Sequence, residues 1–237
     1  MIPPAPHAPS RQLSHPAAIA IVSLIFFMWG GLTSLNDVLI PHLKAVFAMN
    51  YAQTMLIQFT FFGAYFLMSL PSGAVLARLG YKASIVVGLV VAAVGALLFY
   101  PAAKLPSYDL FLGALFVLAS GITLLQVAAN PYISLLGEAT TSHSRLNLAQ
   151  ALNSLGTTLF PYFIGPLILS AAVLGADQLA ALSPDALASY RATQAQSVQA
   201  PYLLLACVLV LLAAFVLLVR IPALREATDA GDSIRHG

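Results

Sequence analysis

Charged residues are scarce in this 237-residue chain. Asp, Glu, Lys and Arg make up 8% of it, whereas 60% of the residues are hydrophobic. Soluble domains carry about 25% charged residues, so this chain has too few to cover a water-facing surface. We therefore predict an integral membrane protein. The net charge of +2 and the lack of any basic run also argue against nucleic acid as a partner.

Cysteine is nearly absent as well. Cys207 is the only one, which excludes an intrachain disulfide, and the Cys and His spacings typical of metal sites are missing. An intramembrane aspartyl protease needs two acids in the membrane, and a rhomboid-like or metal-dependent enzyme needs a histidine there. The predicted spans below meet neither requirement. We therefore expect no enzyme activity, no metal and no cofactor.

Long apolar runs, by contrast, are abundant. A helix needs roughly 17–25 residues to cross a bilayer, and runs of this length are too long for barrel strands, so we predict an all-α membrane bundle. The first run is too long for a signal-peptide core and no cleavage site follows it, so we expect it to be retained. Six spans are predicted, at about 17–40, 53–77, 83–101, 108–135, 147–173 and 200–220.

The basic residues predict the orientation, because cytoplasmic loops are rich in Lys and Arg. With a cytoplasmic N-terminus, seven of them lie inside and three outside. Residues 1–16 are then a cytoplasmic tail, and 221–237 begin a cytoplasmic central loop or tail, in a chain that spans the cytoplasmic (inner) membrane. The inside residues are Arg11, Arg78, Lys82, Arg145, Arg220, Arg225 and Arg235, and the outside ones are Lys44, Lys104 and Arg191. In the longest external stretch, 174–199, Ser183-Pro184-Asp185 predicts the start of a short interfacial helix.

Polar residues are distributed over the spans in a repeating order. Spans one and four carry the most, spans two and five fewer, and spans three and six almost none. Two triplets of this kind predict a 3+3 inverted repeat, as in one half of a secondary transporter, with spans one, two, four and five around a cavity. The alternative is that these residues only hold helices together. The repetition favours the cavity.

Asp37 is the only acidic residue that lies away from the ends of a predicted span. A carboxylate in hydrocarbon costs roughly 2.5–3.5 kcal/mol on insertion scales, so an intramembrane acid indicates a functional site. No Lys or Arg lies away from the ends of a span to form an ion pair with it. We therefore predict that Asp37 is the coupling site of a proton-driven or ion-driven transporter.

Trp29, Thr33 and Asp37 share one helical stripe at i, i+4 and i+8. An aromatic face, a hydroxyl and a carboxylate together suit a sugar, although Trp29 also fits membrane anchoring or packing. Gln58 on span two fits a ligand-binding role and a helix-joining role equally well.

Amide side chains line spans four and five. Gln126 and Asn130 share a face at i and i+4, and Pro131 interrupts the helix there. Gln150 and Asn153 lie deeper in span five than Asn147, which sits near the cytoplasmic mouth. We predict that Gln126, Asn130, Gln150 and Asn153 bind substrate.

These residues also resemble a known family. The turn between spans two and three resembles the corresponding loop of the major facilitator superfamily, with Ala77 in place of the usual acid. Three further stretches resemble its fucose–galactose–glucose proton symporter branch. The turn is Gly73…Arg78-Leu-Gly80-Tyr81-Lys82, and the stretches are Leu35-Asn36-Asp37, Gln126-Val-Ala-Ala-Asn130-Pro131-Tyr132 and Arg145-Leu-Asn147-Leu-Ala-Gln150-Ala-Leu-Asn153-Ser-Leu-Gly156.

The resemblance implies twelve helices in two six-helix bundles, with a hexose bound between them. It implies proton coupling at Asp37, sugar contacts at Gln150 and Asn153, and a conformational role for Gly73, Arg78, Gly80 and Lys82. Fucose permeases carry a second acid where this chain has Gln126, so the resemblance favours the glucose/galactose subgroup, with fucose as the alternative. It leaves the coupling ion open between H+ and Na+.

The chain would supply one bundle of such a protein. We expect a partial sequence whose missing C-terminal six-helix half is its partner, with membrane lipid around both. A half-size protein that works as a dimer is the alternative. A non-transporting assembly subunit is the rival from another class, but it would need neither Asp37 nor a polar cavity.

Overall fold

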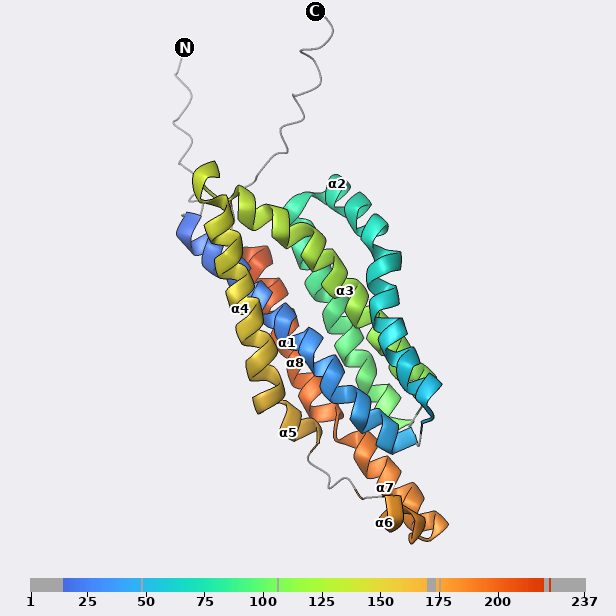
Figure 1. Cartoon of the computed structure of the whole chain (residues 1–237). Helices are drawn as coiled ribbons and strands as arrows, with labels where there is room; N and C mark the ends of the chain where they lie inside the picture. The colour runs from blue at the N-terminus through green and yellow to red at the C-terminus, as the bar shows by residue number, and fades with distance from the viewer. Residues whose placement is uncertain are drawn as a thin grey trace, which may run out of the picture.

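The computed structural model describes residues 15–47, 49–105, 107–169, 174, 176–219 and 222. All regular structure in these ranges is helical, as predicted (Figure 1). The helices are α1 (His15–Phe47), α2 (Tyr51–Lys104), α3 (Tyr108–Leu135), the 3₁₀ helix η1 (Ala139–Thr141), α4 (Ser142–Phe163), α5 (Gly165–Ile168), α6 (Ala176–Ala180), α7 (Pro184–Gln196) and α8 (Gln199–Leu218).

The second and third predicted spans lie on the two helical arms of α2, which meet at Gly80. Gly80 interrupts α2 with φ 74° and ψ 175°, a conformation that glycine adopts without steric penalty. At this point α2 turns back, so that its two arms run in opposite directions (Figure 1). The predicted turn between the spans is therefore present, as a sharp bend at Gly80 with helical residues directly on both sides.

The fifth predicted span, 147–173, differs most from the structure. α4 begins earlier, at Ser142, and ends at Phe163, after which only the four-residue α5 follows. Pro166 has no backbone N–H to donate to the carbonyl one turn earlier, which accounts for the interruption. The predicted residues 170–173 lie outside the described residues.

Within the described ranges, four segments are long and apolar enough to cross a membrane: Pro16–Lys44, Tyr51–Lys104, Tyr108–Leu135 and Pro184–Leu218. The last combines α7 and α8. α4 carries Asn147, Gln150 and Asn153 and is less apolar. The number of six membrane crossings stays a prediction.

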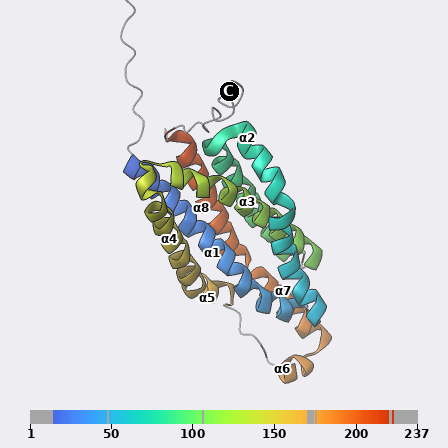
Figure 2. The same cartoon turned by 45° about the horizontal axis from the view of Figure 1, so that its top comes forward.

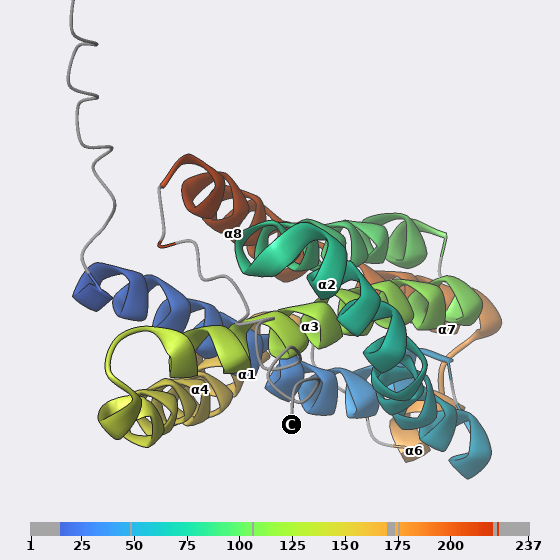
Figure 3. The same cartoon turned by 90° about the horizontal axis from the view of Figure 1, so that it is seen from above.

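Small residues bring the helices together, as is common in membrane bundles. A Cβ atom on Gly30 would overlap the backbone of Asn153, and one on Gly156 would overlap the carbonyl of Phe27, which shows how closely α1 packs on α4. Gly121 is equally tight against Ala92, where α3 packs on the second arm of α2. The view from above shows α1 beside α4 and α3 beside α2 (Figure 3).

The external helix predicted from Ser183 is present as α7. The Ser183 Oγ accepts a hydrogen bond from the Ala186 N–H at 3.3 Å, which caps its first turn. The side of the fold that carries α5, α6 and α7 lies opposite the bend of α2 and the α3–α4 junction (Figure 2). The predicted cytoplasmic residues Arg78, Lys82 and Arg145 thus belong to one end of the bundle, and α7 to the other.

Candidate functional site

Asp37 lies on the open surface of α1, and its side chain is exposed. It is joined to α2 by a short chain of amides. Asn36 Nδ2 donates to Gln58 Oε1 at 2.8 Å, and Gln58 Nε2 donates to Asp37 Oδ1 at 3.3 Å. Asn36 is only 3% exposed, so it holds the Gln58 amide with its nitrogen toward the carboxylate. Gln58 therefore contacts the predicted coupling acid directly.

Tyr65 forms a second link between helices. Gln126 Nε2 on α3 donates to the Tyr65 hydroxyl on α2 at 3.1 Å. Tyr65 thus joins α2 to the predicted site residue Gln126 on α3. On α1, Thr33 Oγ1 donates to the Trp29 carbonyl of its own helix at 2.9 Å.

Trp29 is largely buried, with 9% of its surface exposed, and its ring lies 5.1 Å from that of Phe26 at an angle of 50°. The predicted stripe of Trp29, Thr33 and Asp37 therefore runs from a buried to an exposed end. A direct sugar contact by the Trp29 ring stays a prediction.

The α4 amides are placed differently from one another. Gln150 is exposed, as is Asn147. Asn153 is partly buried, and its Nδ2 donates to the Phe26 carbonyl at 2.9 Å, so it also fastens α4 to α1. On α3, Asn130 is partly buried, and its Oδ1 has no hydrogen-bond partner among the described residues.

The predicted conformational loop lies at the bend of α2. Lys82 Nζ donates to the Leu217 carbonyl at 2.8 Å, which places a cation at the C-terminus of α8. Tyr132 on α3 donates to the Pro222 carbonyl at 2.9 Å on the same side of the fold. Arg78 and Gly80 are exposed, and Gly73 is partly exposed. The bend is therefore fastened to α8 through Lys82.

Arg145 has a structural position that the sequence did not indicate. Its side chain is 8% exposed and donates to the Ile133 carbonyl at 3.1 Å, the Ser134 carbonyl at 2.6 Å and the Glu138 carbonyl at 3.0 Å. A fourth bond joins it to the Thr141 hydroxyl at 2.6 Å. A buried guanidinium thus holds the C-terminus of α3 to the start of α4.

Tyr65 was missed because packing is the ordinary explanation of a tyrosine in an apolar run. Its position contained a signal: it follows Gln58 by seven residues, two helical turns, and so shares its face. Asn36 was quoted as part of a motif, but its role in orienting Gln58 depends on a contact between helices that sequence spacing does not reveal.

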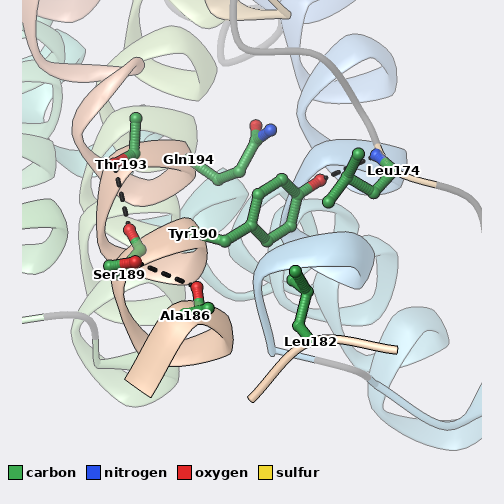
Figure 4. Close-up of a pocket in the computed structure, with 7 residues that line it drawn as sticks. All are labelled: Leu174, Leu182, Ala186, Ser189, Tyr190, Thr193 and Gln194. Atoms are coloured by element: carbon green, nitrogen blue, oxygen red, sulfur yellow. Dashed lines mark hydrogen bonds between the residues drawn. The ribbon is translucent and has the colours of Figure 1, made fainter. Parts of the chain in front are cut away.

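A hollow of about 380 Å³ lies elsewhere, at the end of the bundle that carries α7. It is lined by five residues of α7 and by two leucines that precede this helix (Figure 4). They are Ala186, Ser189, Tyr190, Thr193 and Gln194, with Leu174 and Leu182. The Tyr190 hydroxyl accepts from the Leu174 N–H at 3.0 Å, and the Ser189 and Thr193 hydroxyls donate to carbonyls of their own helix. None of the predicted site residues lines this hollow.

Comparisons with known proteins identify the family. Residues 20–236 match the model of the Major Facilitator Superfamily. The chain is 51% identical over 228 residues to the glucose/galactose transporter of Brucella abortus, covering 96% of this chain and 52% of that protein. It is 46% identical to a putative glucose/galactose transporter of Helicobacter pylori, covering 90% of this chain and 50% of that protein.

The L-fucose-proton symporter of Escherichia coli is 38% identical over 91% of this chain and 50% of its own length. The crystal structure of this symporter, FucP, in the outward conformation superposes with a TM-score of 0.80 and 38% identity, over 90% of this chain and 51% of that one. The chain thus spans about half the length of the relatives it matches. With its apolar helices and these matches, it is a membrane protein that belongs to the Major Facilitator Superfamily.

Proposed function

We propose that this chain is the N-terminal six-helix half of a hexose transporter of the glucose/galactose type, which works by cation symport. The observation that carries the proposal is Asp37: an acid far from the ends of the apolar helix α1, exposed on an open face and bound by Gln58. The 51% identity to a glucose/galactose transporter, against 38% to an L-fucose-proton symporter, supports glucose or galactose over fucose.

The proposed coupling follows from the chemistry of a carboxyl group. The ionised Asp37 only accepts hydrogen bonds, and it takes one from Gln58 Nε2. Once protonated, it gains an O–H donor. Binding a proton therefore changes what Asp37 offers to a sugar hydroxyl or to the facing helices. We take H+ as the coupling ion, with Na+ as the alternative, and no cofactor.

The partner of this chain is proposed to be a second six-helix bundle. Transporters of this kind alternate access by rocking one bundle against the other around a midplane site. The exposed Asp37 and Gln150 belong to the face that such a bundle would cover. In the same proposal, both termini face the cytoplasm and the protein lies in the inner membrane.

The test uses the intact transporter, meaning this chain together with that second bundle, in proteoliposomes. We expect an inward proton gradient to drive accumulation of labelled glucose or galactose, with L-fucose transported at least about ten-fold less efficiently. Accumulation driven by a Na+ gradient alone would establish the alternative ion. Preferred uptake of L-fucose would contradict the proposed substrate, and no sugar uptake under any gradient would contradict the function.

A further inference from the structure

Two hydrogen bonds join Asn36 to Asp37 through Gln58, and the carboxylate decides their direction. An ionised carboxylate only accepts hydrogen bonds, so the Gln58 atom that contacts Asp37 Oδ1 at 3.3 Å is the donor Nε2. The other end of the Gln58 amide, Oε1, can only accept, and it takes a hydrogen bond from Asn36 Nδ2 at 2.8 Å. Both bonds therefore point from Asn36 toward Asp37.

Asn36 is the fixed end of this chain of bonds. Its side chain is 3% exposed, whereas Gln58 is partly exposed and Asp37 is exposed. Asn36 Oδ1 is buried and has no hydrogen-bond partner among the described residues, so within those ranges the Asn36 side chain binds Gln58 alone. Giving up this bond would leave a second buried polar group unpaired, which is unfavourable. Asn36 therefore keeps its donor on Gln58.

The Asn36 bond favours the ionised form of Asp37. It holds Gln58 Nε2 toward the carboxylate in advance, so the amide loses no orientational freedom when the negative charge appears. It also polarises the Gln58 amide, which makes Nε2 a stronger donor. Hydrogen bonds to an ion are about twice as strong as those to a neutral group. A protonated Asp37 therefore gains less from the same arrangement.

We propose that Asn36 is a positioning residue for proton coupling: through Gln58 it stabilises the ionised Asp37, and it thereby sets the pH range in which the transporter binds and releases its proton. This inference rests on the function proposed above. Because the two bonds are in series, Asn36 acts on Asp37 only while Gln58 is present.

Other ionisable groups lie outside this chain of bonds. On α1, Lys44 follows Asp37 by seven residues and so lies on the same face two turns away, and His42 binds a backbone carbonyl of α7. The helices that pack on α1 are α2, α3, α4, α5 and α7. Their stretches without Asp, Glu, His, Lys or Arg are 51–77, 110–135, 146–163 and 165–168, α2 also carries Tyr65, and α7 carries Asp185 and Arg191. Among the described residues, none of these groups bonds Asn36 or Gln58, so a substitution at Asn36 reaches Asp37 through Gln58.

The test measures exchange of labelled for unlabelled hexose by the intact transporter in proteoliposomes, with the hexose concentration and the pH equal on both sides. No gradient is needed, so variants that cannot accumulate sugar can be compared. Proton symport requires the protonated form to carry sugar, so exchange should fall as the pH rises. The measured quantity is the pH at which exchange is half-maximal. The variants are Asn36→Leu, Gln58→Leu, both together, and Asp37→Asn with and without Asn36→Leu.

Asn36→Leu removes the donor to Gln58 Oε1 and with it part of the stabilisation of the ionised form. A proton then binds Asp37 more readily, so the half-maximal pH should rise by about half a unit, or about three-fold in proton concentration. Gln58→Leu removes the bond to the charge itself and should raise the half-maximal pH by about one unit. The double variant should match Gln58→Leu alone, since nothing then connects Asn36 to Asp37.

Two controls separate this role from packing. Thr54→Val changes a buried position on α2, one turn before Gln58, whose hydroxyl binds the Asn50 carbonyl. It should leave the half-maximal pH unchanged. In the Asp37→Asn background, Asn36→Leu should have no effect on the pH profile. If Asn36→Leu does not fold, Asn36→Ala, which lacks the same donor, decides the question.

An unchanged or lower half-maximal pH in the deciding Asn36 variant would overturn the inference. A shift of the same size in the Gln58→Leu or Asp37→Asn background, or in Thr54→Val, would overturn it as well. If exchange by the unmodified protein does not depend on pH, both proton coupling and the role of Asn36 have failed. If the unmodified protein exchanges no hexose, the proposed function has failed and this inference with it. If it exchanges hexose with the expected pH dependence and the Asn36 variant does so identically, only the role of Asn36 has failed.

Discussion

At the scale of single residues, Gln58 determines how Asp37 is held. Replacing Gln58 with Leu removes the donor to Asp37 and leaves the buried Asn36 amide without its acceptor. An unsatisfied buried polar group costs about 1–3 kcal/mol, so we expect a lower melting temperature in detergent and impaired gradient-driven uptake. Gln150→Leu, at an exposed position, is the matched stability control. Equal melting temperatures for both variants would show that the hydrogen bonds of Gln58 to Asn36 and Asp37 contribute nothing to stability.

Of the two predicted α4 ligands, Gln150 gives the more direct test of sugar binding. It is exposed, whereas Asn153 also binds the Phe26 carbonyl. Gln150→Ala should therefore raise the half-saturation concentration for sugar about ten-fold without lowering the melting temperature, and Asn153→Ala should change both. An unchanged affinity in a folded Gln150→Ala protein would leave α4 with a structural role only.

The individual site residues differ in how far the sequence revealed them. Asp37 stands out because an acid in an apolar run has no structural explanation of its own. Gln58, Gln126 and Asn153 were identified as polar residues in spans, but their partners are carbonyls, hydroxyls and amides of other helices. Such contacts depend on how helices pack, which spacing along one helix does not contain. For the same reason, Tyr65 and Arg145 were not recognised.

At the scale of helices, the junction between α3 and α4 depends on Arg145. Its guanidinium binds three carbonyls and one hydroxyl while almost fully buried. Arg145→Met should destabilise the protein by about 3 kcal/mol, because one buried and three partly buried hydrogen bonds lose their charged donor. Thermal unfolding measures this, with Arg78→Met, at an exposed position, as the control. A loss below about 1 kcal/mol would mean that water replaces the guanidinium without penalty.

Helix positions were predictable where hydrophobicity alone determines them. α3 and α8 lie within about two residues of their predicted spans, since long apolar runs must satisfy their own backbone. The α4 boundaries differ from the predicted span by several residues because polar residues extend its start and Pro166, which lacks an N–H, interrupts its end. The sharp bend between the two arms of α2 depends on the conformation of Gly80, which apolar periodicity does not encode.

At the scale of the whole molecule, our proposal makes this chain one bundle of a two-bundle architecture. Residues 1–237 alone should therefore not accumulate sugar in proteoliposomes, because alternating access requires a second bundle to move against. Co-expression with a matching C-terminal half should restore uptake. Net accumulation by residues 1–237 alone would contradict this and support the half-size dimer.

The most direct test of the central claim is transport by Asp37→Asn in the intact transporter, measured both as uphill uptake and as sugar exchange at equal concentrations. Asn keeps the size of the side chain but cannot bind and release a proton. We predict that accumulation driven by the proton gradient is abolished while exchange of labelled for unlabelled hexose continues. An Asp37→Asn protein that still concentrates sugar as the unmodified protein does would contradict the assignment of Asp37 as the coupling site.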